Sequence, residues 1–178
     1  MKRNLSILLA GAVALLGAGI PQEDLLAALP KAKVSLEDGV RQLTKGDEVA
    51  ISAKFEMEEG HLSLSVYTVE KGLAADAEHN VLKEFAGSPE GSEYKPKAEV
   101  FEDKPHISRA SMQLTLMSIS KLSLLDLVAK AKKDQAGTVF SVKPMLKGHK
   151  AAAEVLVANQ GKTVQLWYDL LTGAAMKE

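Results

Sequence analysis

Apolar and polar side chains alternate most regularly between residues 49 and 67. From Val49 to Met57 every second residue is apolar, and a return run from 62 to 67 alternates in the same way. A period of two is typical of a strand with one buried and one solvated face. Because Glu59-Gly60 separates the two runs and suits a tight turn, the pattern predicts an antiparallel hairpin.

A second set of alternating runs lies near the C-terminus. The pattern predicts a strand from Val139 to Leu146, a return strand from Glu154 to Ala158 and a third strand from 162 to 168. Asp169 to Gly173 is predicted to be the turn that ends the third strand, because glycine adopts positive φ without strain. In that strand one side carries Val164, Leu166 and Tyr168, and the other carries Thr163, Gln165 and Trp167.

Two helices are predicted where a serine precedes apolar residues at helical spacing. Ser35 is the expected N-cap of the first helix, which Gly46 ends, and Ser123 is the expected N-cap of the second, which Gly137 ends. The apolar faces are Leu36, Val40 and Leu43 in the first helix, and Leu124, Leu127, Val128 and Ala131 in the second.

Three other segments are less regular. Residues 21–33 form a short leader with one helical turn that Pro30 ends. Residues 86–106 contain several glycines and prolines, which predicts a linker. Residues 107–121 fit both the alternation of a strand and the spacing of a helix, and both alternatives stay open.

The second half of the chain repeats the first at an offset of 88 residues. Ser35 corresponds to Ser123 and Gly60 to Gly148, and beyond the second strand the offset becomes 93, which pairs Asp76 with Asp169. The repeat predicts an α+β protein of two repeated units, each a helix packed on a short antiparallel sheet (αβββ). The predicted boundaries are 1–20 for a signal peptide, 21–33 for the leader, 34–92 for the first unit and 93–178 for the linker and the second unit.

The N-terminus has the pattern of a secretory signal. Lys2 and Arg3 precede an apolar run from Leu5 to Ile20, and small residues follow near its end. The run is shorter than the roughly 20 residues that span a bilayer. We therefore expect a cleaved signal, a secreted or periplasmic mature chain, and no stable membrane insertion after cleavage.

Composition narrows the chemistry. The chain has 178 residues and no cysteine, which excludes disulfides, thiolate metal sites and a cysteine nucleophile. Residues 21–91 carry 7 basic and 14 acidic side chains, a net charge of −7, and residues 92–178 carry 13 basic and 9 acidic ones, a net charge of +4. The two halves are either solvated surfaces of opposite sign or a polarised molecule that presents one charged lobe to a partner. Because the lysines lack interleaved aromatic residues, nucleic-acid binding is not expected.

No motif for catalysis, cofactor or metal binding stands out. The four histidines are scattered without metal-ligand spacing, and His61 and His149 directly follow predicted turns. Adjacent carboxylates such as Glu58 and Glu59 are typical of solvated turns, and no serine lies in a nucleophile elbow. We therefore predict no catalytic, cofactor-binding or metal-binding residues and a protein that is not an enzyme.

The helix starts, the turn glycines and the closing strand resemble the PepSY domain. The closing motif is Tyr168-Asp169-Leu170-Leu171-Thr172-Gly173, and the likeness covers residues 34–85 and about 120–178. In the first half, Asp76 to Asn80 lacks the closing Thr-Gly. The resemblance implies a non-enzymatic module that binds or restrains a peptidase or another envelope protein. Tandem copies are also similar to the fold of β-lactamase-inhibitory proteins.

Two aromatic residues are the candidate partner contacts. Trp167, the only tryptophan, lies on the polar side of its strand, where it either packs against a helix as part of the core or forms an exposed contact on an open sheet face. Tyr67 lies on the corresponding polar side of the return strand in the first hairpin. The expected function is an exported binding or inhibitory module for an envelope or secreted protein. The alternative is a carrier of a small lipid or peptide ligand in the periplasm.

Overall fold

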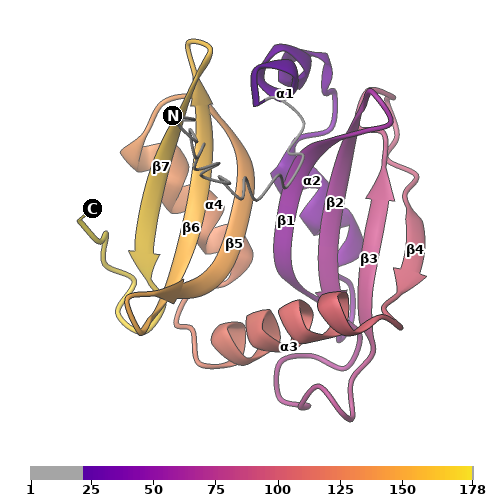
Figure 1. The fold of residues 1–178 in the computed structure, drawn as a ribbon, viewed down its shortest axis with the longest axis vertical. Helices are drawn as coiled ribbons and strands as arrows, with labels where there is room; N and C mark the ends of the chain where they lie inside the picture. Colours follow the sequence, from indigo (N-terminus) through magenta and orange to yellow (C-terminus); the bar gives the residue numbers. More distant parts are fainter. Residues whose placement is uncertain (1–21, 178) are drawn as a thin grey trace, which may run out of the picture.

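One seven-stranded antiparallel sheet forms the centre of the protein, with the strand order β4-β3-β2-β1-β5-β6-β7 (Figure 1). This computed structural model describes residues 22–177. Each strand pairs antiparallel with its neighbours. The strands are β1 (Val49–Glu58), β2 (His61–Val69), β3 (Leu82–Gly87), β4 (Lys97–Val100), β5 (Thr138–Lys147), β6 (Lys150–Asn159) and β7 (Lys162–Asp169).

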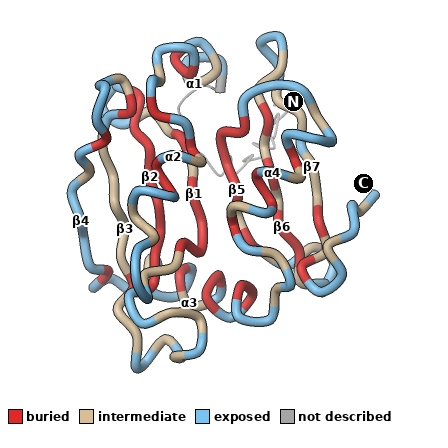
Figure 2. Tube along the Cα trace, turned by 180° about the vertical axis from the view of Figure 1, so that it is seen from behind, coloured by how far each residue is buried: buried red, intermediate tan, exposed pale blue. Residues whose placement is uncertain are grey.

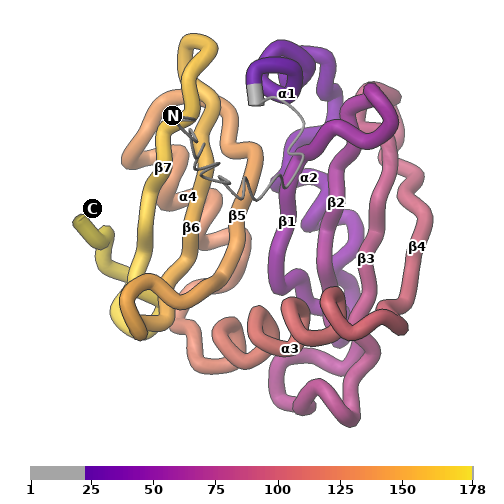
Figure 3. Tube along the Cα trace, in the orientation of Figure 1, coloured from indigo at the N-terminus to yellow at the C-terminus, as the bar shows by residue number. Residues whose placement is uncertain are grey.

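Helices cover the two faces of the sheet unequally. Helices α2 (Leu36–Leu43) and α4 (Leu124–Asp134) lie on one face, as the view from behind in Figure 2 shows. Helix α3 (Lys104–Ser118) crosses one end of the other face, which the tube in Figure 3 also shows. The described part of the chain begins with α1 (Gln22–Ala28) and a 3-10 turn, η1 (Leu29–Lys31), which pack against the α2/α4 side.

The prediction of two units, each with its own short sheet, is wrong. Strands β1 and β5 pair at Ala53↔Val142 and Lys54↔Ser141, which joins all seven strands into one sheet. A single core cluster also contains residues of α2, α4 and both halves of the sheet. The edge backbone groups of β1 need hydrogen-bond partners, and β5 supplies them, a pairing that alternation along one strand does not reveal.

The predicted helix starts are confirmed. The Ser35 side chain accepts a hydrogen bond from the Asp38 backbone N–H at 3.1 Å. Ser123 and Asp126 form a reciprocal capping box, in which each side chain bonds the backbone N–H of the other residue. These bonds satisfy N–H groups that the first turn of a helix leaves without intrahelical partners.

The alignment of the two hairpins differs by one residue from the predicted offset. The β1–β2 turn has positive φ at Glu59 and Gly60, whereas the β5–β6 turn has positive φ at Gly148 and His149. The offset is therefore 88 at the helix caps and 89 in the hairpins. The additional residue lies between the N-cap of α4 and the β5–β6 turn.

A β-bulge changes the predicted faces of β1. The register with β2 shifts between Ala50 and Ser52, so the period of two is interrupted there. Ile51 consequently packs in a second cluster under α3, whereas Ala50, Ala53 and Phe55 belong to the main core. The alternation predicted from 49 to 57 holds only from Ser52 onward.

The segment whose conformation was open is helical. Helix α3 starts after Asp103, whose side chain accepts a hydrogen bond from the His106 backbone N–H at 3.1 Å. Ala110, Leu114 and Met117 pack with Tyr67 and other residues of the second cluster, which attaches α3 to the sheet. The predicted linker 86–106 contains β4 and the first turn of α3.

The predicted signal peptide, residues 1–20, lies outside the described residues. Among residues 22–177, no helix combines the length and the apolar character that crossing a membrane requires.

Candidate functional site

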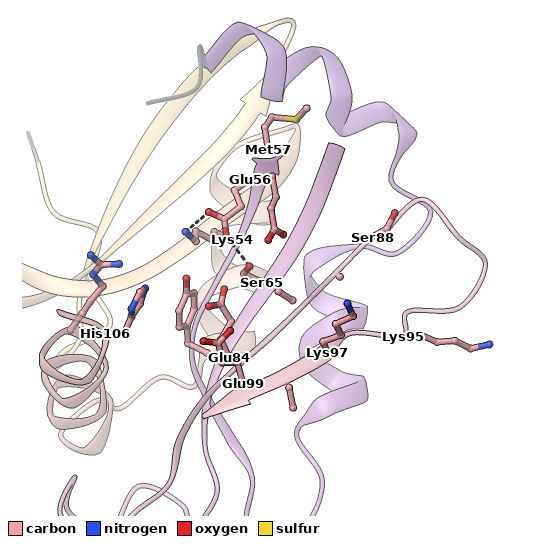
Figure 4. A pocket seen from close by; sticks show the side chains of 16 residues that line it. Lys54, Glu56, Met57, Ser65, Glu84, Ser88, Lys95, Lys97, Glu99 and His106 are labelled. Carbon is pink, nitrogen blue, oxygen red and sulfur yellow. Dashed lines mark hydrogen bonds and ion pairs between the residues drawn. The ribbon is translucent and has the colours of Figure 1, made fainter. Parts of the chain in front are cut away.

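A broad depression lies on the sheet face that carries α3, beside that helix (Figure 4). It has a volume of about 760 Å³. Strands β1 to β4 form its floor and one wall, and the first turns of α3 contribute His106 and Arg109. We call this depression the sheet groove.

Small side chains create the sheet groove. Ser65 of β2 stands opposite Ala86 of β3, and Gly87 follows at the end of β3. Longer side chains at Ser65 and Ala86 would fill the space above the strands. In the sequence, this floor is indicated by the serines on the polar face of β2. Among the described residues, α3 is the helix that crosses this face, and it covers only one end of it.

The strand register arranges the charges of the sheet groove in rows. Glu84 and Glu99 stand directly opposite each other in the row nearest α3. In the next row Lys54 and Lys97 lie at the two sides of the small floor residues. Glu56 lies in the third row. The charge therefore alternates acidic, basic, acidic along the strand direction.

Only part of this charge is neutralised within the groove. Glu56 accepts hydrogen bonds from Lys54 Nζ at 2.5 Å and from Ser65 Oγ at 2.8 Å. Among residues 22–177, Lys97 and Glu99 form no ion pair within 4.0 Å. Like charges directly opposite each other on neighbouring strands are unfavourable, so the row of Glu84 and Glu99 favours an incoming cation.

Three neighbouring aromatic rings support the α3 end of the sheet groove. The ring centroids of Tyr67 and Phe101 lie 5.7 Å apart, and those of Phe101 and His106 lie 5.1 Å apart. His106 Nδ1 also lies 2.6 Å from Asp103 Oδ2, and hydrogen bonds from His106 lower the pKa of Asp103. These contacts fix the first turn of α3 against the sheet.

Tyr67, one of the two predicted partner contacts, lies in the floor of the sheet groove but is only 7% exposed. Burial raises the pKa of its hydroxyl, and the nearby charges of Glu84 and Glu56 raise it further. At this exposure Tyr67 presents little surface to a partner, and its role as a partner contact stays a prediction.

Trp167, the other predicted contact, lies far along the sheet on β7 and does not line the sheet groove. It stands opposite Glu154 in register, on the face away from α4, and is partly exposed. Lys147 Nζ lies 4.5 Å from the centroid of its ring. Trp167 is thus no core residue against a helix, and its role as a partner contact stays a prediction.

The histidines lie at separate positions. His61 begins β2 and His149 lies in the β5–β6 turn, as predicted, whereas His79 Nδ1 lies 2.7 Å from Asp76 Oδ1 in the loop between β2 and β3. Within residues 22–177, no group of three or more His, Asp or Glu side chains could hold a metal ion.

Sequence reasoning missed most of the groove residues. Lys97 and Glu99 lie in the segment 86–106, which was predicted to be a linker. His106 lies in the same predicted linker and Arg109 in the segment 107–121, and no pattern placed them beside β1. The available signal was the polar alternation of β1 and β2, which marked a sheet face without a covering helix.

No family model matches the chain, and no curated protein matches it. The resemblance to the PepSY domain therefore stays a prediction. One solved structure is similar, the 1.85 Å crystal structure of a candidate lipoprotein from Clostridium difficile 630. It is 12% identical, covers 82% of this chain and 92% of its own, and has a TM-score of 0.40. A likeness at this level carries no argument about function.

Proposed function

We propose that this chain is an exported, non-enzymatic binding module that uses the sheet groove to hold another envelope or secreted protein. The observation that carries the proposal is the open sheet face, where Lys97, Glu99 and Arg109 line a depression without forming ion pairs among the described residues. Polar surfaces of this kind are satisfied by complementary polar groups of a partner. The N-terminal pattern of Lys2, Arg3 and the following apolar run supports export.

A protein suits this surface better than an apolar small ligand does. Sites for small apolar ligands are mostly lined by hydrophobic side chains, whereas charged residues dominate the sheet groove. On the opposite face, side chains such as Leu64, Val66 and Val155 are fully buried between the sheet and the helices. The carrier alternative therefore has no observation in its favour.

A peptidase is one kind of partner that this proposal includes. An open sheet face can cover the active-site surface of a peptidase and thereby inhibit it without any catalytic residue of its own. This version of the proposal predicts that the mature chain lowers the activity of a co-purifying peptidase in proportion to the complex formed.

A crosslinking experiment tests the proposal. The mature chain would be crosslinked in an envelope extract of its source cells, in parallel with the variant Lys97→Glu/Glu99→Lys. Both side chains are exposed on the edge strand β4, so folding should be unaffected. The control Glu78→Lys/Lys162→Glu makes the same charge changes at exposed positions that do not line the groove.

We expect the wild type and the control to capture the same protein, and the groove variant to lose at least about three-quarters of it. That loss corresponds to roughly 1 kcal/mol of binding free energy. Equal capture by all three chains would show that the sheet groove is not the binding surface. Capture of no specific protein by the wild type would contradict the proposed function itself.

A further inference from the structure

We propose that the sheet groove takes an extended segment of the partner in which every second residue is, in order, basic, acidic and basic. This inference rests on the proposed function and names the chemistry of the segment. It follows from the register of β1 to β4, which sets the rows of Glu84 and Glu99, of Lys97, and of Glu56.

The spacing of the rows fits an extended chain. Neighbouring rows lie two residues apart along a strand, which is about 6.6 to 6.8 Å at roughly 3.3 to 3.4 Å per residue. Side chains i, i+2 and i+4 of an extended segment repeat at the same distance and lie on one face. A segment that runs along the strands therefore brings one side chain over each of the three rows.

The floor of the groove leaves room for that segment. Ser65 and Ala86 form the middle of the second row, between the side chains of Lys54 and Lys97. Their small size lets the partner side chains reach down between the charged rims (Figure 4). The labelled side chains of Lys54, Glu56 and Ser65 come together over β1 and β2 in this view.

The three rows contribute unequally. Glu56 already accepts hydrogen bonds from Lys54 and Ser65, so the third row attracts a positively charged side chain least. Glu84 and Glu99 stand opposite each other, so the first row attracts a positively charged side chain most strongly. In the second row, Lys97 is the cation without an ion pair among the described residues. The expected pattern is symmetrical, so it fits either direction of the partner chain.

Nuclear magnetic resonance titration of the 15N-labelled mature chain tests the inference with two synthetic peptides. The first is Ser-Thr-Arg-Thr-Asp-Thr-Arg-Thr-Ser. The second is its isomer Ser-Thr-Arg-Thr-Arg-Thr-Asp-Thr-Ser, which has the same composition, net charge and spacing but places the acidic residue at one end. Any difference in affinity therefore reports the order of the charges.

We expect the first peptide to bind about threefold or more tightly than its isomer, which is the size of effect that exposed ion pairs produce. The amide signals of Ser65 and Ala86 should shift together with those of Lys97 and Glu99. In the variant Lys97→Glu/Glu99→Lys, the preference for the first peptide should disappear. Because both altered residues are exposed, an unchanged thermal transition can establish that this variant is folded.

Equal affinities for the two peptides would overturn the inference, and so would shifts confined to β4 or the absence of shifts with both peptides. A result in which the cellular partner depends on the sheet groove but the peptide order has no effect would contradict only the charge pattern. A result in which the peptides discriminate but no cellular protein is captured would contradict the proposed function instead.

Discussion

Gly39 in α2 lies so close to Leu64 in β2 that a Cβ atom on Gly39 would overlap the Leu64 side chain. Glycine inside a helix usually costs stability relative to alanine. Here the missing side chain lets α2 approach the sheet directly, and the same position lies in contact distance of the Tyr94 ring. The glycine that interrupts the helical pattern of the sequence is therefore a packing requirement.

We predict that Gly39→Ala destabilises the protein by about 1 to 3 kcal/mol, because the added methyl group overpacks the contact with Leu64. Urea unfolding followed by circular dichroism would measure the change. Leu64→Val removes the atom that the added methyl group would overlap, so the cost of Gly39→Ala should be smaller in that background. A stabilising effect of Gly39→Ala, as helix propensity alone would give, would contradict the close packing.

The capping box of α4 gives a prediction about pH. Hydrogen bonds from Ser123 lower the pKa of Asp126 below its ordinary value of 3.8. A carboxyl whose pKa is lower in the folded state contributes stability above its unfolded pKa and loses it as the pH falls through the folded value. As the pH is lowered from about 5 to about 2, the free energy of unfolding should decrease in both proteins. We expect the decrease to be smaller in Asp126→Asn than in the wild type.

Ser123→Ala tests the same capping box by removing the serine hydroxyl instead of the carboxyl. It should cost about 0.5 to 2 kcal/mol near neutral pH, which is the usual range for loss of an N-cap. The pH dependence should also become weaker, because the carboxyl of Asp126 loses the hydrogen bonds that lower its pKa. The exposed Ser118→Ala, at the last residue of α3, is a control that should leave the pH dependence unchanged.

Local features of the fold could be predicted from the sequence, and long-range pairing could not. Ser35, Ser123 and the Glu59-Gly60 turn act through neighbours within a few residues, so their patterns were sufficient. The pairing of Ala53 with Val142 joins residues 89 positions apart, and nothing in either strand specifies it. The same limit applies to the sheet groove, whose residues come from five separate elements.

Trp167 provides a probe for where the partner binds. It lies on β7, separated from the β1–β4 groove by β5 and β6 in the sheet order, and its ring contacts Lys147. If the partner segment occupies only the sheet groove, tryptophan fluorescence should not change when the Arg-Thr-Asp-Thr-Arg peptide binds. A full-length partner that quenches or shifts the fluorescence would instead extend the interface to Trp167, as the sequence predicted.

The single sheet predicts that both halves of the chain unfold together. The main core joins Leu64 of β2 to Val155 of β6 through shared helices and strands, so this core belongs to both halves. Leu64→Ala removes a fully buried side chain in the first half and should cost about 2 to 5 kcal/mol. We expect this variant to lower the urea midpoint of Trp167 fluorescence, which reports the second half, as much as the midpoint of circular dichroism.

Val155→Ala, in the second half, is the matched control and should also give coincident transitions. Separate midpoints, with Trp167 unaffected by Leu64→Ala, would instead indicate two independently folding units.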